Sequence, residues 1–172
     1  MKKIIFLTIV LCVLSCKKLV DWDKFQLQKT EYTGSQLRTD GYYYELLSDG
    51  SFSSLCCFYR NGILLDMGGA FNNFKVMDEY VQRTFINSNH YSLMRASWGL
   101  FVLKNNCIQF ERYYPNSSFV TKSFIRDGIV LSDTSFHITV SYRSDGSEIR
   151  TKDEYYYFRK FSPKPDSTNI FF

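Results

Sequence analysis

The chain has 172 residues and a net charge of +4, and 18% of its residues are aromatic. This length fits one domain with a substantial hydrophobic core. Without Lys2 and Lys3, the 21 basic residues become 19 against 17 acidic ones. Such a small surplus argues against nucleic-acid binding as the main task, and we expect no nucleic-acid partner.

The N-terminal segment predicts export and lipid attachment. Lys2 and Lys3 precede an apolar run over 4–14, which is too short to span a membrane but fits the central part of a signal peptide. The run ends in VLSC, with a small Ser15 before Cys16. This order resembles the lipobox of bacterial lipoproteins. The resemblance implies that the Cys16 sulfur takes a diacylglycerol, that the leader is removed before it, and that the lipid anchors the chain to a membrane.

These features divide the chain into four expected segments. They are a signal peptide over 1–15, the lipidated cysteine and a polar tether over 16–36, a β-barrel-like domain over 37–162, and an extended tail over 163–172. A short element over about 22–27 that rests on the domain is an alternative for part of the tether. The expected location is the cell envelope, on the outer membrane of a Gram-negative bacterium. The sequence leaves open whether the domain faces the periplasm or the cell surface.

Three further cysteines remain after Cys16. Cys56 and Cys57 are neighbours, and neighbours on a strand face opposite sides, so at most one of them can meet Cys107. We expect three free thiols, with a disulfide from Cys107 to Cys56 or Cys57 as the alternative. No Cys-x-x-Cys pair and no Cys/His cluster occurs, so we expect no metal and no other cofactor.

From residue 37 the pattern is typical of antiparallel β-structure. Turn signals that tolerate a positive φ recur at Asp49-Gly50, Asn61-Gly62, Asn105-Asn106, Asp127-Gly128 and Asp145-Gly146. Runs rich in aromatic and β-branched residues predict strands over 40–47, 53–59, 63–67, 98–104, 107–114, 119–126, 128–131, 135–143 and 154–161. The run over 135–143 alternates strictly, which predicts Phe136, Ile138, Val140 and Tyr142 on one face.

One segment has helical spacing instead. In NNFKVMDEYVQRTFINSN, the residues Phe74, Met77, Val81 and Phe85 recur at the helical period, and Asn72 or Asn73 can cap the start. This predicts one amphipathic helix over about 73–87. Together the elements predict a mainly β domain, a single antiparallel meander of eight or nine strands that closes into a barrel or half-barrel.

Four stretches carry a family resemblance: LRTDGYYY, CCFYRNGILL, WGLFVLKNN and EYYYFRKFSPKPDSTN. They resemble short lipid-anchored proteins of Bacteroidota that have a KPDSTN-type tail, and the resemblance covers residues 37–169. It implies a lipocalin-like β-barrel of the kind that often holds a small apolar ligand. It carries over no catalytic residue.

The residue pattern favours binding over catalysis. No nucleophile motif, phosphate-binding loop or dinucleotide pattern occurs, and neither His90 nor His137 has a second histidine at ligand spacing. Aromatic side chains on strands can stack on a sugar ring or grip an acyl chain. The candidate ligand-binding residues are Tyr42, Tyr44, Trp98, Arg112 and Tyr113.

Arg112 is a candidate because a charge on an apolar face needs a partner or an anion. We expect a non-catalytic, lipid-anchored protein that binds a small ligand, a glycan or a lipid. An interaction or scaffold module that docks on an envelope protein is the alternative, and an enzyme is the second alternative.

Overall fold

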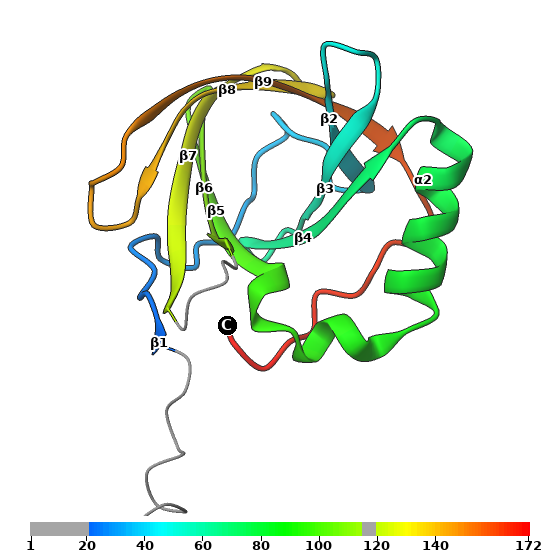
Figure 1. Ribbon diagram of the computed structural model, residues 1–172, viewed down its shortest axis with the longest axis horizontal. Coiled ribbons are helices and arrows are strands. Elements are labelled where there is room, and N and C mark those ends of the chain that lie inside the picture. Colours follow the sequence, from blue (N-terminus) through cyan, green and yellow to red (C-terminus); the bar gives the residue numbers. More distant parts are fainter. Residues whose placement is uncertain (1–20, 115–119) are drawn as a thin grey trace, which may run out of the picture.

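The computed structural model describes residues 21–114 and 120–172. The predicted signal peptide and the predicted lipidation site Cys16 lie outside the described residues. Within them, eight antiparallel strands form a closed barrel, and a helical segment lies on its outside (Figure 1).

Each strand of the barrel pairs with the next in sequence. The strands are β2 (Gly41–Leu46), β3 (Phe52–Phe58), β4 (Ile63–Phe71), β5 (Trp98–Lys104), β6 (Cys107–Tyr114), β7 (Val120–Ser132), β8 (Ser135–Arg143) and β9 (Arg150–Lys160). The last strand returns to the first, with pairs from Gly41↔Lys160 to Leu46↔Tyr155. This closure removes the edges of the eight-stranded sheet, which other chains could otherwise pair with.

Four of the five predicted turns are confirmed by their backbone geometry. Gly50, Gly62, Asn105 and Gly146 have φ values of 81°, 80°, 55° and 85°. Residues that tolerate this left-handed region allow a tight reversal between antiparallel strands. The turn chemistry of the sequence therefore sets most of the hairpins.

The fifth predicted turn, Asp127-Gly128, is wrong. β7 continues through it as one strand, and its pairing with β8 shifts register, because Asp127 lies opposite Val140 whereas Gly128 lies opposite Ile138. The glycine is needed for a close approach of strands, since a Cβ atom at Gly128 would lie 2.2 Å from the carbonyl oxygen of His137. Thr139 is the extra residue of this β-bulge.

The bulge also breaks the predicted alternation of β8. Phe136 and Ile138 are buried inside the barrel, as the alternation predicts. Beyond the bulge, Ser141 is buried and pairs with Arg126. The hydroxyl of Tyr142 instead donates to the Asp127 carboxylate (3.2 Å) on the opposite face. The predicted face that joined Tyr142 to Phe136 is therefore wrong beyond Ile138.

The predicted helix is confirmed between β4 and β5. α2 (Phe74–Val81) continues as a turn of π-helix, η1 (Gln82–Ile86), and the carboxamide oxygen of Asn73 accepts from the Val76 amide (2.9 Å) at its start. Two short 3₁₀ turns follow, η2 (Asn89–Leu93) and η3 (Arg95–Ser97). The fold class is therefore as predicted, a mainly β barrel with one inserted helix.

The inside of the barrel is filled by large side chains. The largest of them, each nearly inaccessible to solvent, are Tyr43, Phe58, Phe101, Phe110, Phe136 and Tyr156. The rings of Phe136 and Tyr156 stack with centroids 4.7 Å apart. Aromatic pairs of this kind contribute about 0.5–1.5 kcal/mol each beyond the burial of their area. The middle of the barrel is therefore a packed core.

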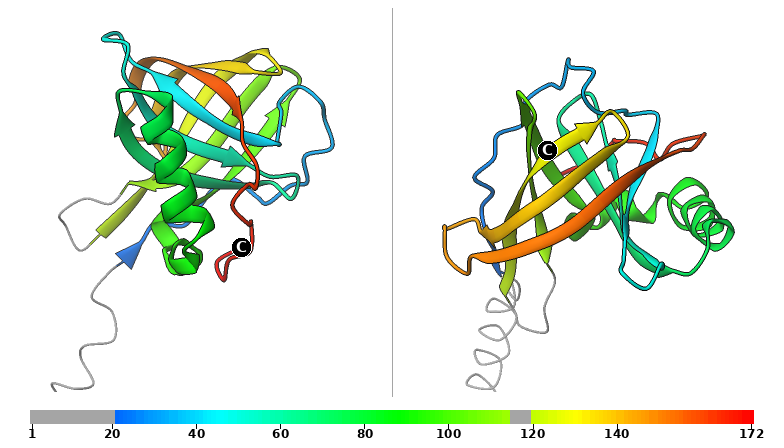
Figure 2. Two further views of the ribbon diagram at one scale, coloured as in Figure 1. Left: turned by 90° about the vertical axis from the view of Figure 1, so that its right-hand side faces the viewer. Right: turned by 90° about the horizontal axis from the view of Figure 1, so that it is seen from above.

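A second apolar layer lies between the outside of the sheet and the helical segment. The side chains of the neighbours Cys56 and Cys57 point into different layers, Cys56 into the barrel interior and Cys57 into the outer layer. Met77 and Val81 of α2 are fully buried in that layer. In Figure 2 (left), α2 crosses the outer face of the strands.

The N-terminal segment belongs to the barrel, which corrects part of the predicted tether over 16–36. β1 (Asp21–Trp22) pairs in parallel with β7, and Tyr32 and Leu37 are buried in the interior cluster. The Arg38 amide donates to the carbonyl oxygen of Asp133 (3.0 Å) in the β7–β8 turn. Residues 32–38 thus cover the end of the barrel that holds this turn, and residues 21–36 are part of the domain.

The C-terminal tail is extended, as expected, and is fastened to the barrel by Lys164. Its amine donates to the carbonyl oxygens of Thr39 (2.8 Å) and Phe58 (2.6 Å) and lies 3.7 Å from the ring centroid of Tyr59. The hydroxyl of Tyr59 donates to the carbonyl oxygen of Pro165 (2.8 Å). Burial lowers the pKa of Lys164 to about 8.

This lowered pKa predicts a pH-dependent contribution to stability. Between about pH 8 and pH 10.5 the unfolded chain binds more protons at Lys164 than the folded chain does, so this contribution rises with pH. In chemical unfolding titrations, the stability of the wild type relative to Lys164→Met should increase by at most about 3 kcal/mol from pH 7 to pH 10.5. The matched control is Lys75→Met, at an exposed amine of α2. The prediction would be contradicted if the difference in unfolding free energy between the wild type and Lys164→Met changed with pH as little as the difference for Lys75→Met.

Candidate functional site

The hollow at one mouth of the barrel is the candidate functional site. Its volume is about 260 Å³, and its lining consists of Tyr114, Lys122, Phe124, Arg126, Ser141, Glu148, Arg150 and Lys152. These residues come from β6, β7, β8, β9 and the β8–β9 turn. The mouth lies at the opposite end of the barrel from the β7–β8 turn that residues 32–38 cover.

Strand register places this lining on the inner face of the barrel. Residues directly opposite each other on antiparallel strands share a face. The core residue Phe110 lies opposite Arg126, which in turn lies opposite Ser141 across the next pair of strands. Tyr114 lies opposite Lys122 by the same rule. The inner face therefore changes from aromatic in the middle of the barrel to basic at its mouth.

Basic side chains outnumber acidic ones at the mouth. Lys122 and Arg150 both contact Glu148, at 2.7 Å and 3.4 Å. Arg126 and Lys152 both contact Glu154, the latter at 3.0 Å. Each carboxylate thus serves at least two cations, which leaves a surplus of positive charge around the hollow.

Arg126 is the buried member of this group and lacks one hydrogen bond. It is 7% exposed, and its guanidinium contacts Glu154 and the hydroxyl of Tyr156 (3.1 Å). Its Nε–H has no partner among the described residues. An unpaired buried donor costs roughly 1–3 kcal/mol. This nitrogen is closed off from solvent, so an anion gains its hydrogen bond when the Arg126 side chain turns toward the hollow.

Arg112 lies deeper, below the hollow. It forms an ion pair with Asp66, and its Nε donates to the hydroxyl of Tyr114 (2.8 Å). Burial opposes the charge of Arg112, but Asp66 and Tyr114 hold its pKa above the ordinary value, so the side chain remains charged. The ring of Tyr114 contacts two cations, with the guanidinium carbons of Arg112 and Arg126 at 4.6 Å and 5.3 Å from its centroid.

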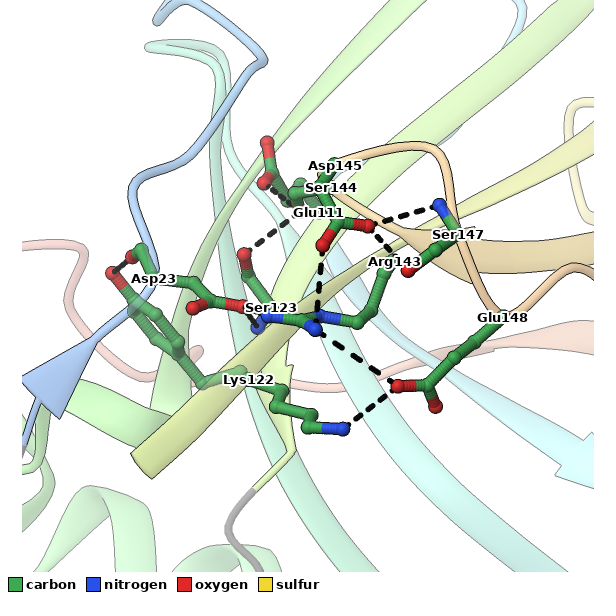
Figure 3. A network of polar contacts seen from close by, with 10 residues as sticks. Asp23, Glu111, Lys122, Ser123, Arg143, Ser144, Asp145, Ser147 and Glu148 are labelled. Carbon is green, nitrogen blue, oxygen red and sulfur yellow. Dashed lines mark hydrogen bonds and ion pairs between the residues drawn. The ribbon is translucent and has the colours of Figure 1, made fainter. Parts of the chain in front are cut away.

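A polar network beside the mouth holds the N-terminal segment in place (Figure 3). The Asp23 carboxylate accepts from the Ser123 amide (3.2 Å) and from Arg143 (3.0 Å). The buried Glu111 accepts from the amides of residues 26 and 27, each at 2.8 Å, and from the hydroxyl of Ser144.

The surroundings of Arg143 make this network a poor anion site. Three carboxylates lie within 4.0 Å of its guanidinium, those of Asp23, Asp145 and Glu148. Its Nε–H is also without a partner among the described residues, but the acidic surroundings repel a second anion. The network is therefore a structural clasp, and the cationic surplus belongs to the mouth.

The five predicted ligand-binding residues do not form one site. Arg112 alone lies beside the hollow. Tyr113 lies on the outer face of β6, where its hydroxyl donates to the carbonyl oxygen of Asp23 (2.9 Å). Trp98 is fully buried, and its indole N–H donates to the carbonyl oxygen of Tyr91 (3.1 Å).

The two remaining candidates pack outside the barrel. Tyr42 is fully buried under α2, where its hydroxyl donates to the Asp78 carboxylate (2.6 Å). Tyr44 packs edge-on against the rings of Phe52 and Phe74. The hollow is therefore not lined by Tyr42, Tyr44, Trp98 or Tyr113, whose side chains serve packing and helix attachment.

Sequence reasoning missed most of the mouth for an identifiable reason. Lys122, Phe124 and Arg126 alternate along β7 and could have been assigned to one face. Arg150 and Lys152 precede the predicted start of the last strand, and the observed strand begins at Arg150. The basic residues of the mouth were missed because a turn was predicted at Asp127-Gly128 and because the last strand was predicted to start only at residue 154.

The three described thiols are free, so the alternative disulfide is not present. Cys107 is exposed at the start of β6, whereas Cys56 and Cys57 are buried in β3, with two strands between them. Burial raises the pKa of Cys57 to about 11 and that of Cys56 well above its ordinary value.

This arrangement predicts one reactive thiol in the folded protein. In the mature chain with Cys16→Ser, a disulfide reagent should modify Cys107 rapidly, because the thiolate is the reactive form and the other two thiols are buried and protonated. Cys56 and Cys57 should react only after unfolding in guanidinium. Additional Cys107→Ser should abolish the rapid phase. If the Cys16→Ser variant showed no rapid phase, and its mass were two hydrogens below that expected for three free thiols, Cys107 would instead be in a disulfide.

Comparison of the chain with protein-family models, with curated proteins and with solved structures finds no match in any of the three. In the part of the chain that the structure describes, no helix is long and apolar enough to cross a membrane. The functional interpretation therefore rests on the geometry and charge of the barrel mouth.

Proposed function

We propose that the protein is a lipid-anchored, non-catalytic binding protein of the cell envelope whose barrel mouth takes the anionic group of a small or extended ligand. The observation that carries this proposal is the buried Arg126, with an unpaired Nε–H, in a hollow where four basic side chains face two carboxylates. The ligand class is a phosphate or a carboxylate joined to an apolar or sugar portion.

The mouth suits an anion for two reasons. Arginine presents several donors in a fixed plane, which matches the oxygens of phosphate and carboxylate groups. The shared carboxylates Glu148 and Glu154 leave positive charge that an incoming anion balances. The side chains of Tyr114 and Phe124 provide the aromatic wall against which the rest of a ligand can pack.

The size of the hollow limits what it can enclose. About 260 Å³ is slightly smaller than typical small-molecule sites, which range over roughly 300–1,000 Å³. The aromatic core below leaves no route for a long chain into the middle of the barrel in the described residues. The anionic group therefore binds inside the mouth, and the remainder of the ligand extends toward solvent.

Charge removal at the mouth tests the binding proposal. In a titration of the folded domain with inorganic phosphate and with acetate, followed by NMR, amide shifts should gather at β7 and β9. Arg126→Gln should weaken binding at least about tenfold, since a hydrogen bond to a charged group contributes about 1.5–3 kcal/mol. The double variant Arg150→Gln with Lys152→Gln keeps Arg126, and it should weaken anion binding to a similar extent. The matched control is Arg83→Gln, at an exposed arginine of η1. Equal affinities in control and mouth variants would refute the site.

Replacement of the lipidated cysteine tests the anchor. Cys16→Ser should prevent incorporation of labelled fatty acid and shift the protein from the membrane to the soluble fraction of the envelope. The reason is that the lipid chains hold the protein by about 0.8 kcal/mol for each buried CH₂ group, and stable attachment needs more than one chain. Cys107→Ser is the control and should retain the label. Unchanged membrane retention of Cys16→Ser would contradict the anchor.

A further inference from the structure

The described chain begins beside an apolar surface that is open to solvent. Trp22 of β1 lies beneath Arg95 of η3, with 5.2 Å between the guanidinium carbon and the ring centroid. The two residues before Arg95 are exposed, Leu93 by 63% and Met94 by 47%. Met94 also lines an apolar hollow of about 330 Å³, together with Met67, Tyr80, Phe85 and Tyr91.

The C-terminus reaches the same end of the molecule. The ring of Phe172 stacks on Phe25, with centroids 5.3 Å apart, and Ile170 is 76% exposed. In Figures 1 and 2 (left), β1, the green 3₁₀ turns and the C-terminus all lie at the lower end, and the β7–β8 turn lies at the upper end. We call this lower surface, formed by Leu93, Met94 and Ile170, the anchor face.

The distance from Cys16 to the domain is short. Because β1 is paired with β7, only residues 16–20 separate the expected lipid from the barrel. Five residues span at most about 18 Å when fully extended. A tether of this length gives the domain an effective concentration at the bilayer of the order of millimolar. Even a weak affinity of the anchor face for lipid is then enough for contact.

Charge at this end matches a lipid surface. Arg95 is exposed and directly follows Met94, Lys24 is exposed two residues after Trp22, and Lys17 and Lys18 follow the expected lipidated cysteine in sequence. Basic residues close to a membrane are attracted to anionic head groups by about 1 kcal/mol each. Apolar side chains flanked by basic ones are the composition of surfaces that lie at the membrane interface.

We propose that the anchor face rests on the bilayer that holds Cys16, with Leu93, Met94 and Ile170 at the boundary between head groups and acyl chains. This inference rests on the lipid anchor proposed above. It gives the domain one orientation at the membrane, with the β7–β8 turn pointing away from it.

A reconstitution experiment tests this orientation independently of acylation in cells. The mature chain 16–172 with Cys107→Ser is coupled through Cys16 to a maleimide lipid, in nanodiscs of phosphatidylethanolamine and phosphatidylglycerol. A gadolinium-chelating lipid in the disc broadens the methyl signals of residues that lie near the bilayer. The signals of Leu93 and Met94 should broaden strongly. Leu131, which is 53% exposed in β7 at the other end, should not.

Variants separate docking from mere tethering. Leu93→Asp with Met94→Asp should lower the ratio of docked to free domain about tenfold, because the burial of these side chains in lipid is lost. Leu131→Asp is the matched control and should leave the ratio unchanged. Equal broadening of Leu93 and Leu131 in the parent chain would overturn the orientation. In the double variant docking is followed through the methyl signals of Ile170, and full broadening of these signals would also overturn it. Because the coupling is chemical, either result refutes the anchor face and leaves acylation of Cys16 to its own test.

Discussion

The register shift between β7 and β8 is the constraint on which the mouth of the barrel depends. Before the shift, aromatic residues such as Phe136 occupy the interior, and after it Ser141 and Arg126 face each other there. Because side chains alternate along a strand, one extra residue exchanges the faces of everything beyond it. Thr139 is that residue, and Gly128 allows the two strands to approach closely enough to accommodate it. A packed core and a polar mouth therefore coexist in one pair of strands.

The N-terminal segment connects the two proposed roles of the protein. The clasp around Asp23 and Glu111 fastens this segment to the strands that carry the mouth, and it shares Glu148 with the lining of the hollow. The same fastening shortens the tether to the membrane. Ligand binding and membrane attachment are thus proposed at adjacent parts of one rigid barrel, and the geometry of the first few described residues affects both.

The sequence predicts the fold better than the site. Hydrophobic alternation and turn chemistry are local properties, so most strands, four turns and the helix follow from them. The bulge at Asp127-Gly128 depends on the neighbouring strand, and the same dipeptide is a turn signal when considered alone. The roles of Tyr42 and Trp98 depend on a helix that covers the outside of the sheet. Aromatic content cannot show which face of a strand is covered, so it did not indicate which side chains lie at the mouth.

The closing pair of strands also determines when the protein can fold. Gly41 pairs with Lys160, so the barrel cannot close until almost the entire chain is present. β1 also pairs with a distant part of the chain, because Asp21 lies opposite Val120 of β7. Contacts between residues this distant in sequence make folding slow, because the entropy of closing long loops is lost before the contacts form. The transport that the proposed envelope location requires therefore moves an open chain, which acquires its basic mouth only once β9 has arrived.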